Sequence, residues 1–152
     1  MKVVEIAEPG GPEVLRLSER ANPVPAAGEV LVRVRASGLN RADLLQRRGK
    51  YPPPPGFPAD VPGLEFAGKV VAVGEGALLR SVGDRVMGLV GGGAHAELVV
   101  SHELELIPIP DRLSDVEAAA IPEVYLTAYD GWSFYTPQIV LVPIEDEEPY
   151  WL

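Results

Sequence analysis

The sequence predicts a mainly β domain of the α+β class, in which about seven short strands and two small helices form a β-barrel or sandwich. Its 152 residues suffice for one ordinary domain with a buried core. Sixteen glycines and sixteen prolines lie between apolar runs, which is typical of strands joined by tight turns. Between residues 29 and 36, Val30, Val32 and Val34 alternate with Leu31, Arg33 and Arg35, the period-two pattern of a strand.

The expected strands are apolar, β-prone runs bounded by turn signals such as Pro9–Pro12, Gly74–Gly76 and Gly83–Asp84. Each run is short, and none approaches the roughly 20 apolar residues of a membrane span. The strands are expected at residues 3–6, 14–17, 29–36, 66–73, 85–90, 94–100 and 103–107.

Two short helices are predicted from their end signals. Asn40 is a favourable N-cap and Gly49 a favourable stop, so residues 41–48 are expected to form about two turns. Ser114 is expected to cap a second helix at 115–120, which carries acidic residues in its first turn, as the helix dipole prefers.

Two segments rich in proline or glycine are interpreted as loops. Residues 51–58 include five prolines and cannot form a helix or a central strand, because proline lacks the backbone donor. The three glycines at 91–93 precede a strand, whereas a phosphate-binding G-x-G-x-x-G lies between a strand and a helix. Arg41, Arg47 and Arg48 are interpreted as a solvated helix face rather than a phosphate site.

Charge and composition exclude several classes of protein. Residues 1–112 carry all 13 basic residues against 14 acidic ones, and residues 113–152 carry eight acidic residues and no basic one. Nucleic-acid binding is not expected, because phosphate contacts need clustered cations. The absence of cysteine excludes disulfides and thiolate metal ligands and is compatible with the cytoplasm. The N-terminus has no long apolar stretch, so no signal peptide is expected.

Several motifs in order along the chain carry a family resemblance. Together they resemble the N-terminal half of the zinc-free, zeta-crystallin-like quinone oxidoreductases of the medium-chain dehydrogenase/reductase superfamily, and the likeness is continuous from residue 1 to about residue 129. The motifs lie at residues 36–44, 49–52, 62–70, 82–86, 92–97 and 118–123.

The resemblance implies a GroES-like fold, a partly open β-barrel that faces a Rossmann domain across the active-site cleft. It implies hydride transfer from NADPH to a quinone or an enone-like acceptor. By position, Asn40 and Tyr51 are the candidate catalytic residues and line the nicotinamide and substrate side, and Thr127 approaches the nicotinamide. Asp43 is expected to orient its neighbours.

Each candidate also has a purely structural explanation. Asn40 can be a helix cap, and both roles can hold together. Tyr51 can pack against the prolines, although a phenol there can also donate a hydrogen bond or stack on a flat ring. Thr127 stands just before the point where the resemblance ends. Glu65 is interpreted as structural, bonding the backbone or an arginine.

No zinc is expected. Zinc-dependent members of the superfamily use a cysteine just after the strand that here ends at Ala36, and a Gly-His-Glu triplet that here has Leu64 at its centre. His95 and His102 remain as nitrogen donors, without a convincing third ligand. Hydride reduction of a quinone needs no Lewis acid, because hydrogen bonds can stabilise the acceptor oxygen and water can protonate it.

The chain is expected to divide into a catalytic, substrate-side domain at 1–129 and a divergent tail at 130–152. In the tail, residues 138–142 are expected to form a strand that completes the barrel. The acidic and aromatic residues 145–152 form either a solvated terminus or a docking peptide. No G-x-G-x-x-G motif occurs, so the Rossmann domain is expected to be absent, through engineering, truncation or natural loss.

Two functions therefore compete. The first is an oxidoreductase domain that is inactive without a cofactor domain, since catalysis requires both reactants in one geometry. The second is a non-catalytic binding or oligomerisation module, which would self-associate through the apolar face left exposed between domains.

Overall fold

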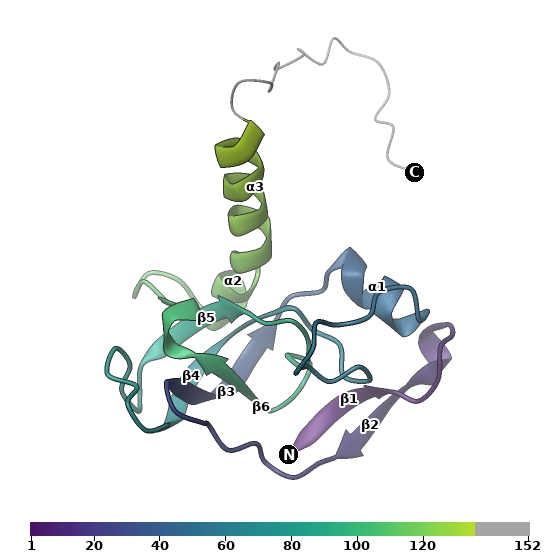
Figure 1. Ribbon diagram of the computed structural model, residues 1–152, viewed down its shortest axis with the longest axis horizontal. Helices are drawn as coiled ribbons and strands as arrows, with labels where there is room; N and C mark the ends of the chain where they lie inside the picture. Colours follow the sequence, from purple (N-terminus) through teal and green to yellow (C-terminus); the bar gives the residue numbers. More distant parts are fainter. Residues whose placement is uncertain (136–152) are drawn as a thin grey trace.

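Two antiparallel sheets organise the computed structural model, which describes residues 1–135 of the chain and side chains as far as residue 131. A five-stranded sheet has the order β6-β3-β4-β5-β7 and curls into a half-barrel, and β1 and β2 form a separate hairpin beside it (Figure 1). The mainly β, partly open architecture predicted from the sequence is confirmed. The strands are β1 (Lys2–Ile6), β2 (Leu15–Glu19), β3 (Glu29–Ser37), β4 (Glu65–Val73), β5 (Arg85–Leu89), β6 (Leu98–His102) and β7 (Leu106–Pro108).

The larger of two core clusters lies on one face of the central strands, and the smaller one includes residues 118–119. Val30 and Val32 of β3 are fully buried beside Phe66 and Val70 of β4, as the period-two pattern of β3 predicted. Gly68 lets β4 approach β3 closely, because a Cβ at this position would lie 2.2 Å from the carbonyl oxygen of Arg33. The two strands thus form the best-packed part of the half-barrel.

Both predicted helices are present. The structure has α1 (Arg41–Arg47) after Asn40, and α2 (Asp115–Ala119) after Ser114. At α2, Ser114 Oγ accepts the Glu117 N–H at 3.2 Å, and Glu117 Oε2 accepts the Ser114 N–H at 2.8 Å, which is a complete capping box. The predicted solvation of Arg41 and Arg48 is confirmed, but that of Arg47 is wrong. Arg47 is 8% exposed, because the end of α1 packs on the Pro9 turn, where the Gly10 N–H donates to the Arg47 carbonyl.

A third helix was not expected. α3 (Pro122–Tyr135) begins with proline at its first position, where the missing N–H has no cost, and it runs across the predicted boundary at residue 129 (Figure 1). Its sequence, PEVYLTAYDGWSFY, contains β-branched, aromatic and glycine residues, which are poor helix formers. Propensity therefore gave no signal for this helix.

The last two strands are displaced from their predicted positions. The predicted strand at 94–100 is wrong in its first half, because β6 begins only at Leu98. Residues 94–96 hydrogen-bond other segments instead. The Ala94 N–H donates to Gly63 O at 3.1 Å, and His95 O accepts the Val4 N–H at 2.8 Å. The predicted strand at 103–107 begins instead as a 3-10 turn, η2 (Glu103–Glu105), in which the His102 imidazole accepts the Leu104 N–H.

The expected strand at 138–142 and the tail at 145–152 lie outside the described residues. An earlier 3-10 turn, η1 (Pro12–Val14), joins β1 to β2. Among the described helices, none combines the length and apolar character needed to cross a membrane.

Candidate active site

Asn40 stands at the junction between β3 and α1. Its backbone N–H donates to Asp43 Oδ2 at 2.7 Å, which closes the first turn of α1. Its side-chain amide nitrogen donates to Glu65 Oε1 at 2.9 Å. Asn40 is therefore the N-cap residue of α1, and its side chain is held by a partner outside that helix.

Glu65 joins this junction to α3. Its carboxylate is 3% exposed, accepts from Asn40 through Oε1, and accepts the Glu123 N–H through Oε2 at 3.0 Å. A carboxylate is stabilised at this point because the N-terminus of a helix carries free N–H groups and the positive end of its dipole. Gly38 makes room for it, since a Cβ there would lie 2.1 Å from Oε1. The predicted structural role of Glu65 is confirmed, with a backbone partner and not an arginine.

Thr127 lies one turn along α3 from Glu123. Its hydroxyl is exposed and donates to Glu123 Oε1 at 3.5 Å. Glu65 thus bonds Asn40 and the backbone of Glu123, and the side chain of Glu123 accepts from Thr127. Asn40 and Thr127 are therefore connected through these two glutamates.

Tyr51 begins the proline-rich loop that follows α1 and is 39% exposed. Among the described residues, no hydrogen bond joins its hydroxyl to Asn40 or Thr127. The loop is anchored further on by Phe57, whose ring covers Gly91 so closely that a Cβ there would lie 2.5 Å from it. Tyr51 therefore stands, partly exposed, at the start of a loop that is anchored at Phe57.

A partly buried polar cluster made by Ser37, Asp43 and His95 was not expected from the sequence. Ser37 Oγ lies 2.8 Å from His95 Nδ1 and donates to the carbonyl of Glu65 at 2.9 Å. His95 Nε2 lies 3.7 Å from Asp43 Oδ2. All three residues lie in the family motifs, but His95 was considered only as a metal donor, and no local spacing shows that the three meet.

Burial favours the neutral form of the His95 imidazole. Burial lowers the pKa of its imidazole below the ordinary value of 6.5, and the nearby carboxylate of Asp43 opposes this effect without cancelling it.

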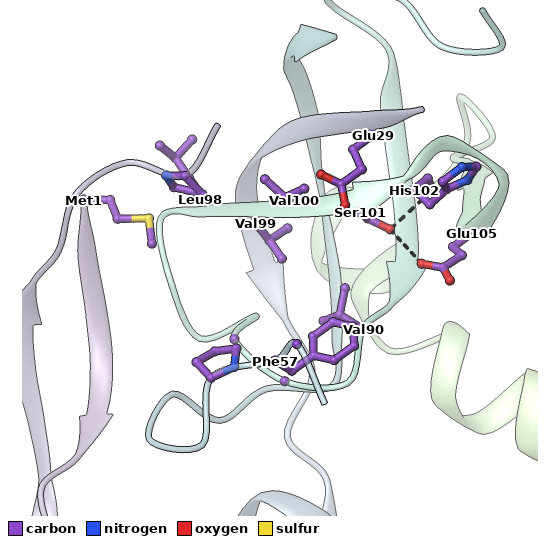
Figure 2. A pocket seen from close by; sticks show the side chains of 15 residues that line it. Met1, Glu29, Phe57, Val90, Leu98, Val99, Val100, Ser101, His102 and Glu105 are labelled. Carbon is purple, nitrogen blue, oxygen red and sulfur yellow. Dashed lines mark hydrogen bonds between the residues drawn. The ribbon is translucent and has the colours of Figure 1, made fainter. Parts of the chain in front are cut away.

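One pocket of the described residues lies away from this cluster and from the predicted site residues. It has a volume of about 490 Å³ and lies between β6, which contributes Val99, and the proline-rich loop, which contributes Phe57, with Ser101, His102 and Glu105 at one end (Figure 2). Asn40, Tyr51 and Thr127 do not line it. We therefore do not take it as the substrate site, despite its size.

A second pocket is lined by sequence neighbours of two predicted residues, although Asn40, Tyr51 and Thr127 do not line it themselves. Its volume is about 400 Å³, and it extends from Pro54 in the loop of Tyr51 to Leu126, the neighbour of Thr127. Phe57, Leu89 and Val90 make most of its wall apolar, as is usual in sites for small flat ligands.

The described residues do not form the phosphate end of a dinucleotide site. Gly91 lies under Phe57, and a Cβ on Gly93 would meet Pro58 at 3.0 Å, so the glycine run packs against the proline-rich loop and is not an open cradle for phosphate. Within this part of the chain, no group of three or more His, Asp or Glu side chains could hold a metal ion.

Comparison with known proteins gives the same fold. Residues 26–111 match the alcohol dehydrogenase GroES-like domain family. The synaptic vesicle membrane protein VAT-1 homolog-like from Mus musculus is 44% identical over 129 residues, which is 85% of this chain and 31% of that protein. The chain therefore spans about a third of the length of this relative.

Solved structures agree. A quinone oxidoreductase from Pseudomonas syringae has a TM-score of 0.80 and 36% identity, over 91% of this chain and 42% of that one. A mycobacterial protein complexed with NADPH has a TM-score of 0.73 and 33% identity, over 89% of this chain and 42% of that one. The predicted GroES-like fold is confirmed.

Proposed function

Because the chain belongs to the alcohol dehydrogenase GroES-like domain family, within the medium-chain dehydrogenase/reductase superfamily, we propose that it is the substrate-side domain of an NADPH-dependent quinone oxidoreductase. The reaction is hydride transfer from NADPH to a quinone or an enone-like acceptor. The observation that carries this proposal is the buried carboxylate of Glu65, which ties Asn40 to the base of the helix that bears Thr127.

Each candidate residue has a role that its surroundings support. Glu65 fixes the amide of Asn40 before any ligand arrives, which lowers the entropy cost of orienting a ligand there. The exposed phenol of Tyr51 can donate a hydrogen bond to the acceptor oxygen or stack on its ring. The Thr127 hydroxyl is available to the nicotinamide end of the cofactor. The nicotinamide supplies the hydride, and water supplies the proton.

The reaction proceeds without zinc in this proposal. Its support is the donor set: the sequence has no cysteine, and Leu64 occupies the position of the histidine ligand. We place the protein in the cytoplasm on the same compositional ground, the complete lack of cysteine.

The 152-residue chain alone is expected to be inactive, because its described part contributes only to the nicotinamide end of a cofactor site. The test is to titrate the purified chain with NADPH while following cofactor fluorescence, and then to add a simple quinone and follow absorbance of the reduced cofactor. No binding and no turnover are expected. Measurable turnover by the pure chain would refute this part of the proposal.

A chimera tests the positive part. Residues 1–129 replace the matching region of a quinone oxidoreductase that has its own nucleotide-binding domain, and the product is expected to bind NADPH and reduce quinone. Asn40→Ala and Tyr51→Phe should each lower kcat/KM by roughly tenfold or more. Asn22→Ala, at an asparagine that accepts from the N-terminus, serves as the control. A folded chimera that binds NADPH without reducing quinone would reject the proposed role.

A non-catalytic binding or oligomerisation module is the second candidate. The observation that favours it is α3, on which Val124, Tyr125 and Tyr129 are between 61% and 67% exposed. Such a module should self-associate as its concentration rises. A monomer that persists at high concentration counts against it.

A further inference from the structure

The carboxylate of Asp43 is hydrogen-bonded to two segments of the chain. It is buried, accepts the Gly63 N–H through Oδ1 at 2.9 Å, and accepts the Asn40 N–H through Oδ2 at 2.7 Å. The first of these bonds reaches the loop before β4, and the second caps α1. Any displacement of Asp43 must therefore move the start of α1, and Asn40 with it.

The hydrogen bonds of Ser37 determine where His95 carries its proton. The hydroxyl has one proton, which it donates to the carbonyl of Glu65, because a carbonyl can only accept. The contact between Ser37 Oγ and His95 Nδ1 then requires a proton on Nδ1. Nε2 is left as the atom that titrates.

His95 Nε2 is buried and has no hydrogen-bond partner among the described residues. It lies 3.7 Å from Asp43 Oδ2, too far for a hydrogen bond and close enough for a strong electrostatic interaction. A buried polar atom without a partner is uncommon and calls for an explanation. Protonation of this atom would give it a partner in Asp43.

The surroundings of His95 determine which group moves. Its backbone N–H donates to Pro62 O at 3.0 Å, its carbonyl accepts from Val4, and its ring is held by Ser37. The backbone of His95 is thus held on both sides, and its ring is held at Nδ1, on the side away from Asp43. A charged ring would draw Asp43 toward itself.

Other charged groups of the described residues lie around His95. Lys2 of β1, Arg35 of β3 and Glu97 line the same surface depression as His95, which has a volume of about 410 Å³. The carboxylate of Glu65, from β4, is engaged with Asn40 and Glu123. Asp43, from α1, is the charged group that faces Nε2.

We propose that Asp43 and His95 form a proton-sensitive pair that positions Asn40. With His95 neutral, the Asp43 carboxylate accepts hydrogen bonds from Gly63 and Asn40 only, and the cap of α1 is held in place. With Nε2 protonated, Asp43 Oδ2 is shared with the imidazolium, and Asn40 shifts toward it. The effect of that shift on hydride transfer rests on the proposed function, whereas the pair itself does not.

The pair can be observed by NMR in the 152-residue chain without any cofactor. The sequence has two histidines, so His102→Asn leaves His95 as the single imidazole. The neutral ring is expected as the Nδ1–H tautomer, with a titration midpoint below 6.5. The backbone and side-chain amide signals of Asn40 should shift with the same midpoint. A neutral Nε2–H tautomer, or Asn40 signals that do not follow the titration of His95, would overturn the proposal.

Two variants separate the pair from a general effect of acid. His95→Asn can keep a donor for Ser37 but has no atom in place of Nε2, so the Asn40 signals should lose this pH dependence. An unchanged titration of Asn40 in that variant would also overturn the proposal. Ser37→Ala removes the acceptor of the Nδ1 proton and should shift the tautomer balance toward Nε2–H. Because these readouts need neither NADPH nor quinone, they stand or fall separately from the proposed function.

Discussion

The half-barrel and α3 differ in the burial of their apolar side chains. In the half-barrel, Phe66 and Val30 are completely buried, because β3 and β4 each have a neighbouring strand on both sides. On α3, Tyr125 and Tyr129 are mostly exposed, and Figure 1 shows the helix projecting from the sheet, which it meets at its base. The first region is stabilised by its own packing, whereas the second depends on its N-terminal attachment.

This difference separates stability from function along the chain. Folding free energy is concentrated where apolar area is buried, in β3, β4 and the strands beside them. The predicted site residues lie where the half-barrel ends, at Asn40 and Thr127. Substitutions should therefore affect folding strongly in the core, moderately at the attachment of α3, and weakly along its exposed face.

Phe66→Ala should have the largest effect. It removes a fully buried ring from the centre of the core and should destabilise the protein by about 3–5 kcal/mol. Urea unfolding followed by circular dichroism measures the change. Leu17→Ala, at an exposed position on β2, is the control and should change stability by about 0.5 kcal/mol or less. Equal effects of the two substitutions would show that the half-barrel core is not the source of stability.

Glu65→Gln should have the second largest effect. The amide keeps the size of the side chain, but it has one acceptor atom where the carboxylate serves the two donors Asn40 and Glu123, so a loss of about 1–3 kcal/mol is expected. Amide hydrogen exchange should accelerate in the first turns of α3. Glu19→Gln, on the exposed edge of β2, is the matched control. Unchanged protection of α3 would mean that Glu65 does not attach the helix.

Acidification should weaken the fold moderately. The pKa of His95 is lower in the folded protein than its ordinary value of 6.5, so the unfolded chain binds this proton more readily. The contribution of neutral His95 to the free energy of unfolding is fully present above pH 6.5. It is lost as the pH falls from 6.5 through the lower pKa of the folded protein. Unfolding free energies measured at several pH values should show this loss in the wild type and not in His95→Asn, the carboxylate contribution being common to both. If the free energy of unfolding depends on pH in the same way in the two proteins, His95 does not contribute to the acid destabilisation.

Substitutions on α3 should have the smallest effect on folding and a visible one on association. Tyr125→Ser with Tyr129→Ser removes two exposed rings and should change stability by about 0.5 kcal/mol or less. Sedimentation velocity over a range of concentrations should show weaker self-association than in the wild type. If the wild type is monomeric throughout, the exposed face of α3 does not drive association.

Patterns of neighbouring residues predicted individual strands and helices. The alternation of Val30 and Val32 predicted β3, and the caps at Asn40 and Ser114 predicted α1 and α2, because strand periodicity and helix capping depend on residues a few positions apart. The family motifs led to Asn40 and Thr127, and the structure links those two through Glu65. The link itself could not be predicted, because Glu65 and Glu123 are 58 residues apart.

The sequence by itself determined the class of the fold, most of its strands and the positions of its caps. Tertiary structure alone decided the rest: that residues 94–96 pair with β1 and the Gly63 loop, that Arg47 is buried, and that α3 forms against its propensities. It also decided that Ser37 meets His95 from 58 residues away. The physical reason is that burial and hydrogen bonding depend on which segments meet, and the folded half-barrel brings together residues that no local spacing relates.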